Sequence, residues 1–572
     1  MRGLSPALVL VCALTNLCCT PSVQPEPTRT PAATGSSSAA AANVIVSVVG
    51  TSDLHGHIER APWFAGFLRN LRAARQADGA VVPVDAGDMW QGTIVSNAAE
   101  GAPVVRVFNA LGYAAAAIGN HEFDYGPEGP PATPRSPTDD PRGALKARAK
   151  QARFPLLAAN MLEAATGRPI DWPGVRPFTI VDVAGVRLGI VGVSTEETPN
   201  TTIGANVADL RMAPLAAAIA THASSLRDKH NVAAVIVVAH AGAHCARVDD
   251  PADLSSCDDG EVVRVARSMP AGLVDIIVGG HTHGAVAHRI NGIAIIQSYA
   301  LGRAFGRVDL TIDRATNRVT SSQIHRPRNL CETTAPGCEP GTYEGAPVQA
   351  DDGIARLIAD DMARAEQLRA RKLGVRVNAK LVANHGAETA LGNLLVDLMR
   401  AANAGSDVAL INGGAIRADI PAGEVTYGAM YEAFPFDNRF AQGRVPARAL
   451  AALIGASVQS DGGFISISGL RARASCEGGA VRVRLEREDG RVVREEESLV
   501  VVASDYQVMT KAFADAGMAG LFEIDGDRLI REALVQALEK RGGELDTADK
   551  ALFDPARPRT QVAPERPLRC GQ

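Results

Sequence analysis

The feature that most constrains the fold of this sequence is a set of five short polar clusters. Each cluster directly follows a run rich in valine, isoleucine or alanine. The runs span residues 44–49, 81–84, 114–118, 232–238 and 274–278, and a further run spans 187–193. Short runs of this kind predict buried strands, and their alternation with helical or loop segments predicts an α/β fold. Ligands of open α/β sheets bind at the carboxyl ends of the strands, so the clusters are predicted to meet in one site.

The clusters carry side chains that bind divalent metal ions. They are Asp53-Leu54-His55-Gly56, Gly87-Asp88, Gly119-Asn120-His121-Glu122-Phe123-Asp124, His240-Ala241-Gly242 and Gly279-Gly280-His281-Thr282-His283. The Asp-x-His and His-x-His pairs are each two residues apart, so their members face the same way in an extended segment. Imidazole and carboxylate suit zinc, manganese or iron, and Asp88 could bridge two ions that together attract a phosphate.

Each cluster has an ordinary alternative when it is taken alone. An Asp-x-His sequence occurs in turns, an Asn-His-Glu sequence can cap a helix, and a single histidine such as His240 can be a core or surface residue. The ordered set of five, each after a predicted strand, favours a metal site over these alternatives.

Composition narrows the class of ligand. The length of 572 residues and the 46% apolar content predict a folded chain with two or more domains. The formal net charge is -5 with both signs mixed, which argues against a nucleic-acid polymer as partner. An anionic substrate must then be held locally, by metal ions or by a few arginines. We expect a monomer that acts on a small molecule.

Residues 1–19 are predicted to be an export signal. Arg2 precedes an apolar run at 4–14, which is shorter than the roughly 18 to 20 residues of a membrane-spanning helix. A lipid anchor at Cys18 or Cys19 stays open, because Leu17 stands where lipoprotein signals usually have a small residue. Residues 20–42 are rich in Pro, Ser, Thr and Ala and predict a flexible tether. The predicted location is the periplasm or the cell envelope.

Six cysteines follow this leader, and an even number in an exported chain predicts disulfide bonds. They are Cys245, Cys257, Cys331, Cys338, Cys476 and Cys570. The sequence leaves their connectivity open, and buried free thiols are the alternative that their polar surroundings disfavour. Because no Cys-x-x-Cys pair occurs, a cysteine zinc site is not expected.

A break rich in Pro and Gly at 326–348 divides the chain. We predict a first domain at 43–327 with a long surface loop at 127–141, a linker at 328–350 and a second domain at 351–572. An amphipathic helix is predicted over 351–372 from the helical spacing of its apolar residues. Further helices are predicted at 391–402 and 529–540, and further strands at 408–411, 481–485 and 499–503.

The ordered clusters resemble those of the calcineurin-like metallophosphoesterases. The run at 119–124 and the second half narrow the resemblance to the 5′-nucleotidase family, of the bacterial exported UDP-sugar hydrolase type. The resemblance implies a four-layer αββα sandwich followed by a smaller α/β substrate-binding domain. It implies two divalent ions, one held by Asp53, His55, Asp88 and His283 and the other by Asp88, Asn120, His240 and His281. It also implies that His121 is the catalytic histidine and that Asp124 is its partner.

The same resemblance implies a substrate site in the second half. Arg417, in the run that begins at Asn412, would bind a phosphate or carboxylate, and Phe436 would stack on a nucleobase with Asn438 near it. Tyr506 would be a second aromatic of this site. The alternatives are a surface arginine after a glycine turn and an ordinary core phenylalanine.

Two departures from the family pattern leave the ester open. The sequence has Asn384-His385-Gly386-Ala387-Glu388 where the family carries an arginine, and no Gly-Gly-Asp-Gly run follows Tyr506. The first hypothesis is a phosphohydrolase that releases phosphate from nucleotides through metal-activated water. The second is the same machinery acting on cyclic nucleotides, nucleotide sugars or non-nucleotide esters. A surface binding protein that has lost catalysis is the third, and the complete ligand set argues against it.

Overall fold

The computed structural model describes residues 42–129, 131–331, 337–460 and 462–571. The predicted export signal, the tether up to residue 41 and the alternative lipid sites Cys18 and Cys19 lie outside the described residues. Among the helices that are described, none is both long and apolar enough to cross a bilayer.

Seven strands form the first sheet of the N-terminal domain, in the order β15-β14-β1-β2-β3-β4-β6. They are β1 (Asn43–Thr51), β2 (Gly79–Asp85), β3 (Ala115–Ala117), β4 (Leu156–Leu157), β6 (Val175–Arg176), β14 (Ala304–Asp313) and β15 (Arg318–Asn329). Neighbours from β1 to β6 are parallel, whereas β14 pairs antiparallel with β1 and β15. The strands predicted at 44–49, 81–84 and 114–118 are therefore three adjacent parallel strands.

Six strands form the second sheet, in the order β12-β13-β11-β10-β8-β7. They are β7 (Phe178–Val183), β8 (Val186–Ser194), β10 (Ala234–His240), β11 (Ile276–Gly279), β12 (Ala285–Ile290) and β13 (Ile293–Ser298). The central strands β8, β10, β11 and β13 are parallel. The predicted strands at 187–193, 232–238 and 274–278 correspond to β8, β10 and β11, so the central strands of both sheets bring their carboxyl ends to defined edges.

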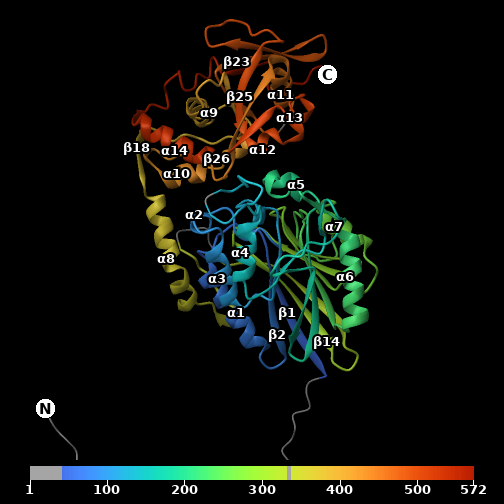
Figure 1. Cartoon of the computed structure of the whole chain (residues 1–572). Coiled ribbons are helices and arrows are strands. Elements are labelled where there is room, and N and C mark those ends of the chain that lie inside the picture. The colour runs from blue at the N-terminus through green and yellow to red at the C-terminus, as the bar shows by residue number, and fades with distance from the viewer. Residues whose placement is uncertain (1–41, 130, 332–336, 461, 572) are drawn as a thin grey trace, which may run out of the picture. The chain divides into compact units, whose positions relative to one another are not determined.

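The two sheets pack face to face through an apolar layer that neither could bury alone. Val46 and Val48 of β1 lie in one buried cluster with Ile236 and Val238 of β10. The outer face of the first sheet is covered by α1 (Ala61–Arg75), α3 (Ala102–Leu111) and α4 (Gly143–Gln151), and that of the second by α6 (Leu215–His230) and α7 (Glu261–Ser268). Figure 1 shows these helices flanking the strands. The predicted αββα sandwich is confirmed.

Shorter elements connect these layers. They are α2 (Ile94–Asn97), α5 (Thr198–Thr201), the 3-10 turns η1 (His121–Phe123) and η2 (Gly204–Asn206), and the strand pairs β5 (Met161–Glu163) with β9 (Leu210–Met212) and β16 (Thr342–Tyr343) with β17 (Ala346–Pro347). The described residues of the predicted loop at 127–141 form turns and bends. Two of these short elements, η1 and α5, carry residues of the site described below.

The second half opens with α8 (Asp352–Arg369), whose N-cap Asp351 accepts a hydrogen bond from the N–H of Ile354. The helix ends before the predicted residue 372, because Lys372 already begins strand β18. Ile354 and Ile358 share a buried cluster with Phe67 of α1, so the apolar face of α8 packs against helices of the first half. A helical pattern in the sequence located this helix but not its end.

Three sheets and their helices form the rest of the second half, which is α/β as predicted. The sheets are β20-β18-β27, β22-β19-β25-β21-β26 and β24-β23-β28. Their strands are β18 (Lys372–Val377), β19 (Val408–Asn412), β20 (Gly423–Thr426), β21 (Arg439–Pro446), β22 (Ile465–Ser468), β23 (Leu470–Glu477), β24 (Ala480–Arg487), β25 (Ser498–Ser504), β26 (Phe522–Leu529), β27 (Gly543–Leu545) and β28 (Thr560–Ala563). The helices are α9 (Ala390–Ala402), η3 (Gly413–Ala415), α10 (Tyr427–Ala433), α11 (Ala447–Gln459), α12 (Asp505–Val508), α13 (Lys511–Asp515) and α14 (Ile530–Arg541).

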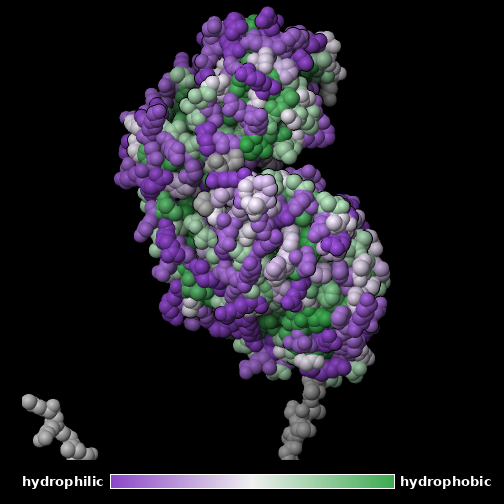
Figure 2. Space-filling view, in the orientation of Figure 1, coloured by the Kyte–Doolittle hydropathy of each residue, from purple (hydrophilic) through white to green (hydrophobic). Residues whose placement is uncertain are grey.

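All six cysteines beyond the leader are paired. The disulfides are Cys245–Cys257, Cys331–Cys338 and Cys476–Cys570, and the last joins residues 94 apart in the sequence. It ties β23 to the end of the chain, which limits how far that segment can separate from the sheet. On the face that Figure 2 shows, hydrophilic residues are widely spread, in keeping with the mixed charges of the sequence.

The two sheets also make a close contact where a glycine faces a leucine. A Cβ added to Gly192 of β8 would lie 2.1 Å from the Cβ of Leu157 and 2.9 Å from its backbone, in strand β4 of the other sheet. The N–H of Ala159 also donates to the carbonyl of Gly192 at 2.7 Å. Because the obstacle includes backbone, no rotamer change can make room for a methyl group here.

We therefore expect Gly192→Ala to lower the free energy of unfolding by about 1–3 kcal/mol through overpacking. Equilibrium denaturation in urea would measure the loss. Gly463→Ala is the control, because an added Cβ there meets nothing within 4 Å. Equal effects of the two substitutions would contradict the role assigned to this contact.

Candidate metal centre

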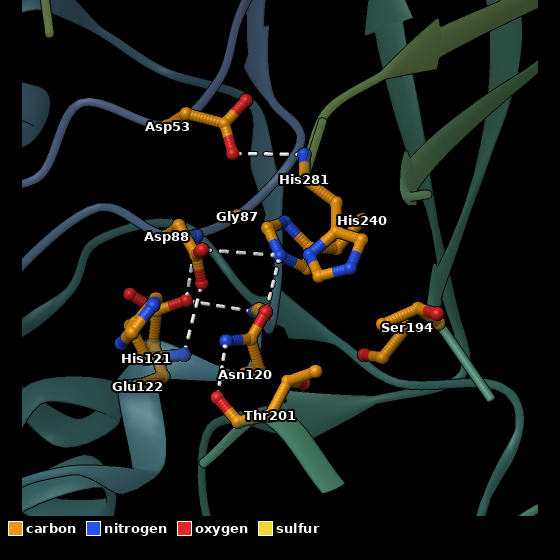
Figure 3. Close-up of polar contacts among 12 residues, drawn as sticks. Asp53, Gly87, Asp88, Asn120, His121, Glu122, Ser194, Thr201, His240 and His281 are labelled. Carbon is orange, nitrogen blue, oxygen red and sulfur yellow. Dashed lines mark hydrogen bonds and ion pairs between the residues drawn. The ribbon is translucent and has the colours of Figure 1, made fainter. Parts of the chain in front are cut away.

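The predicted metal-ligand residues all lie at the carboxyl ends of central strands. Asp53 and His55 follow β1, Asp88 follows β2 and Asn120 follows β3 in the first sheet. In the second sheet, His240 is the last residue of β10, and His281 and His283 follow β11. The face-to-face packing of the sheets brings these two sets together, as Figure 3 shows for several of them.

The side chains form two adjoining groups. In one, ligand atoms of Asp53, His55 and His283 lie within 4.8 Å of one another, and in the other those of Asp88, His240 and His281 do. Asp88 connects them, because its Oδ2 lies 3.8 Å from His55 Nε2 and 3.2 Å from His240 Nε2. The Oδ1 of the Asn120 amide lies 2.8 Å from the same His240 nitrogen. The structure thus brings all seven predicted ligand residues together.

The backbone of this region differs from the extended conformation expected for the Asp-x-His and His-x-His pairs. Five of the seven residues adopt left-handed conformations, with φ of 51° at Asp53, 49° at His55, 56° at Asp88, 74° at His281 and 56° at His283. The expectation was wrong because each strand ends two to four residues before these side chains, and the chain turns sharply there. Non-glycine residues in this region cost of order 1–3 kcal/mol each and cluster at functional sites, so their concentration here supports a functional interpretation.

Two glycines allow the loops after β2 and β3 to touch. A Cβ at Gly119 would lie 2.2 Å from Oδ1 of Asp88 and 2.5 Å from its backbone nitrogen. A Cβ at Gly87, where φ is 94°, would lie 2.9 Å from His240 Nδ1 and 2.8 Å from the backbone nitrogen of Gly119. Side chains at these positions would push Asp88 away from His240 and Asn120.

Burial and charge in the centre fit a cation. The Oδ1 of Asp53 accepts a hydrogen bond from the N–H of His281 at 2.8 Å, whereas its Oδ2 is buried without a hydrogen-bond partner. Burial raises the pKa of Asp53 to about 7 and lowers the pKa of His55 to about 3, so burial favours the neutral forms of both groups. An unpaired buried carboxylate oxygen beside neutral imidazoles is a donor set that suits zinc, manganese or iron.

His121 and Asp124 form a hydrogen-bonded pair at the edge of this centre. The Nδ1 of His121 lies 2.5 Å from Oδ2 of Asp124, and the His121 ring meets the His55 ring edge-on at 5.2 Å between centroids. Although burial of His121 acts to lower its pKa, the charges of Asp124 and Asp88 raise it to about 10. The carboxylate of Asp124 therefore favours the protonated form of this imidazole.

The segment that holds this pair has no signal in the sequence. The hydroxyl of Thr202 donates to Oδ1 of Asp124 at 2.7 Å, and the Asn120 amide donates to the carbonyl of Thr201 at 2.9 Å. These residues end or follow α5 (Thr198–Thr201) and lie about 80 positions away in the chain, with separations of 78 and 81. No local pattern in the sequence could have linked them.

Glu122 was also missed, because the sequence suggested only a helix cap. It is 1% exposed, and its carboxylate accepts hydrogen bonds from the N–H groups of Asp88, Met89 and Gly119 at 2.8, 2.7 and 2.7 Å. Burial and the charge of Asp88 raise the pKa of Glu122 to about 7, against these hydrogen bonds, which lower it. The only signal in the sequence was its position inside the run at 119–124.

The substrate residues expected in the second half are partly assembled. The guanidinium of Arg417, which is exposed, lies 5.2 Å from the ring centroid of the half-buried Phe436. Asn412 ends β19, Asn438 is half-buried and accepts at its carbonyl from the N–H of Ile530, and Tyr506 in α12 is 49% exposed. Arg417 and Phe436 are thus the pair for which the structure gives direct contact.

The position without the expected arginine has a structural explanation. The carboxylate of Glu388 accepts hydrogen bonds from the side chain of Asn393 and from the N–H groups of Arg559 and Thr560. Arg559 in turn forms two hydrogen bonds of 2.7 Å with the carboxylate of Asp397. The segment at 384–388 therefore ends in a residue that anchors β28 rather than in a cation.

Comparisons with known proteins agree with this architecture. The family model of the calcineurin-like phosphoesterases matches residues 46–285, and that of the 5′-nucleotidase C-terminal domain matches residues 362–524. Endonuclease YhcR of Bacillus subtilis is 27% identical over 415 residues, which are 72% of this chain and 31% of that protein. Protein UshA of Yersinia enterocolitica is 26% identical over 426 residues, or 69% of this chain and 72% of that protein. This chain therefore spans about a third of the first relative.

A solved structure has the same fold. The 5′-nucleotidase precursor from Thermus thermophilus superposes with a TM-score of 0.63 at 24% identity, covering 91% of this chain and 100% of that one. The likeness extends over both halves of the chain and agrees with the sandwich and the α/β second half.

Removal and return of metal should be visible in stability. Asp53→Asn deletes the unpaired buried charge, so we expect the metal-free variant to exceed metal-free wild type by about 1–3 kcal/mol in unfolding free energy. Manganese or zinc should raise the melting temperature of the variant by less than that of wild type, because the variant keeps only the group of Asp88, His240 and His281 intact.

Differential scanning calorimetry with chelator and with added ion would measure both effects. Asp249→Asn, at an exposed acid, is the control and should behave as wild type in both conditions. A variant at Asp53 that responds to the ion as strongly as wild type would refute the assignment of this residue.

Proposed function

Because this chain belongs to the 5′-nucleotidase family of the calcineurin-like phosphoesterases, we propose that it releases phosphate from nucleotides by hydrolysis. The observation that carries the proposal is the cluster of seven predicted metal-ligand side chains, most of them buried, beside the His121–Asp124 pair. A binding protein without catalysis would need neither the pair nor the strained backbone that presents the ligands.

We propose two divalent ions, held as the family resemblance implies. One would be bound by Asp53, His55, Asp88 and His283, and the other by Asp88, Asn120, His240 and His281. The Asp88 carboxylate between His55 and His240, and the proximity of the Asn120 oxygen to His240, support this division. Bound ions of this kind polarise a phosphate and lower the pKa of a water molecule.

His121 would act on the reacting phosphate. Asp124 fixes its Nδ1, which leaves Nε2 to face the substrate, and Thr202 fixes Asp124 in turn. The protonated imidazole would stabilise charge that develops on the phosphate or protonate the leaving oxygen. The raised pKa keeps that proton in place near neutral pH.

Arg417 and Phe436 would bind the rest of the substrate. The ring of Phe436 offers a face for a nucleobase, and Arg417, stacked over that ring, offers a forked cation for an anionic group. Burial is the largest cause of the lowered pKa of His283, and the charge of Arg417 is a smaller one. This contribution supports a position of the Arg417 guanidinium facing the metal centre. Asn412, Asn438 and Tyr506 stay predictions as further contacts.

A second candidate is the same chemistry on another phosphate ester. It is favoured by the segment at 384–388, where Glu388 anchors the C-terminal strand and no arginine is present. The named activities of the relatives also differ, since one is called an endonuclease and a solved structure is called a 5′-nucleotidase. Cyclic nucleotides, nucleotide sugars and non-nucleotide esters are the substrates of this candidate.

We further propose that the protein acts outside the cytoplasm. Three disulfides among the described residues support an oxidising compartment, and the apolar leader at 1–19 supports export to the periplasm or cell envelope. The proposed organisation is an export signal at 1–19, a tether at 20–42, a catalytic domain at 43–327, a linker at 328–350 and a substrate domain at 351–572. Lipid attachment at Cys18 or Cys19 is the alternative form of the leader.

The proposed activity predicts chelator-sensitive phosphate release with a preference for nucleotides. Purified protein supplied with manganese or zinc would be assayed on AMP, ATP, UDP-glucose, a cyclic nucleotide and an aryl phosphate, each with and without chelator. We expect kcat/KM for AMP or ATP to exceed that for the aryl phosphate by at least about tenfold, because stacking on Phe436 contributes about 1–3 kcal/mol.

Phe436→Ala separates the two candidates within the same assay. It should raise KM for nucleotides by about tenfold or more and leave KM for the aryl phosphate unchanged. Activity that is confined to the cyclic nucleotide or the aryl phosphate and insensitive to this substitution would replace the first candidate by the second. Absence of turnover on every ester would reject both.

His121→Ala should lower kcat by about 10²- to 10⁴-fold, because it removes the proton donor and not a metal ligand. Metal content, measured by mass spectrometry after gel filtration, should equal that of wild type. His325→Ala is the control, because that imidazole bonds Asp309 in the first sheet at 2.9 Å. Retention of wild-type kcat by the His121 variant with full metal content would eliminate its proposed role.

A further inference from the structure

We propose that Glu122 is a positioning residue that fixes the loops after β2 and β3 so that Asp88 and Asn120 can bind the same ion. The inference rests on the proposed function for the identity of these ligands, and it concerns a residue outside the seven predicted ligands. Figure 3 shows Glu122 beside Asp88, His121 and Asn120.

One carboxylate joins three backbone donors from two loops. Oε2 of Glu122 accepts from the N–H of Asp88 at 2.8 Å and from that of Gly119 at 2.7 Å, while Oε1 accepts from the N–H of Met89 at 2.7 Å. The connection is reciprocal, because the N–H of His121 donates to Oδ1 of Asp88 at 2.9 Å. Glu122 therefore acts through backbone groups that flank the ligands.

The loops need such a connection because the sheet ends before them. The register of β2 and β3 includes only the pairs Val84 with Ala115 and Asp85 with Ala116. Beyond these pairs the chain enters left-handed conformations at Gly87 and Asp88, with φ of 94° and 56°. A strained conformation persists only where its surroundings determine it. The Glu122 carboxylate accepts one hydrogen bond on each side of Asp88 Cα, from the N–H of Asp88 and from that of Met89.

The chemistry of the position requires a carboxylate of this length. Three N–H groups converge on two oxygens, and a carboxylate is an acceptor at both. In Glu122→Gln, an NH₂ group replaces one of the two oxygens. In one orientation of the amide, the N–H of Met89 loses its acceptor, and in the other, the N–H groups of Asp88 and Gly119 lose theirs. In Glu122→Asp, the charge is kept but the side chain is one methylene shorter and cannot reach all three donors.

The experiment compares Glu122→Gln with a matched variant, Asp275→Asn. Asp275 is also a largely buried carboxylate that accepts from a backbone N–H, that of Val235 at 2.7 Å. It directly precedes β11 and so lies at the amino end of that strand, whereas His240 and His281 lie at the carboxyl ends of β10 and β11. Replacing it perturbs a hydrogen bond of the same kind and an ion pair with Arg227 without touching the ligand loops, so it measures the part of any effect that is general destabilisation.

Manganese would be titrated into chelator-stripped protein by calorimetry, without substrate, and amide exchange would be followed at Asp88, Met89 and Gly119. We expect Glu122→Gln to weaken manganese binding at least about tenfold and to speed exchange at these amides at least about tenfold, relative to wild type. Asp275→Asn should leave both quantities unchanged. Glu122→Asp should reproduce the weakened binding, and it provides the test if the glutamine variant does not fold.

The outcomes separate this inference from the proposed function. If Glu122→Gln and Glu122→Asp bind manganese as wild type does, or lose no more affinity than Asp275→Asn, the inference is overturned whatever the enzyme hydrolyses. If wild type binds manganese, the Glu122 variants lose affinity and no ester is hydrolysed, the proposed substrate class fails and the positioning role stands. Phosphate release by the glutamine variant should recover partly at high manganese, because only the affinity is impaired.

Discussion

The apolar contact between the two sheets is the interaction on which the site depends. Val46 and Val48 of β1 and Ile236 and Val238 of β10 are fully buried in the layer between the sheets. Their burial fixes the sheets face to face, and it thereby fixes the ends of β1, β2 and β3 beside the ends of β10 and β11. Gly192, packed against Leu157, allows part of this approach without a side chain in between. Neither sheet alone carries a complete set of ligands.

The chain leaves the strands through turns that the sheet cannot stabilise. Asp53, His55, Asp88, His281 and His283 all have left-handed backbone, a conformation that is costly for residues other than glycine. Hydrogen bonds from outside the turns compensate this cost. The Asp53 carboxylate accepts from the N–H of His281, and Asp88 accepts from the N–H of His121. Ligand side chains thus also hold the loops of other ligands, so the site is organised as one network.

Four buried carboxylates lie in or next to the centre. Asp53 and Asp88 lie among the histidines, while Asp85 and Glu122 accept hydrogen bonds from backbone N–H groups of the same loops. Burial raises the pKa of Asp85 well above its usual range, against the hydrogen bonds from Thr51 and Gly87. So many buried carboxylates in one place are costly unless cations lie near them, which is the electrostatic reason for proposing divalent ions here.

The sequence by itself determined the strands, the order of the polar clusters that follow them, and therefore the candidate ligand residues. Periodicity and residue type act locally, so β1, β2, β8 and β10 and the histidines and aspartates that follow them could be recognised without knowing any contact. The helix at α8 was also predicted, although its end was not, because Lys372 is recruited into β18 by pairing with Thr426 from a distant segment. Tertiary structure alone decided the left-handed turns, the hydrogen bond from Asn120 to the carbonyl of Thr201, that from Thr202 to Asp124, and the three hydrogen bonds to Glu122. These depend on which loops lie side by side, and that is set by the packing of two sheets whose strands are far apart in the chain.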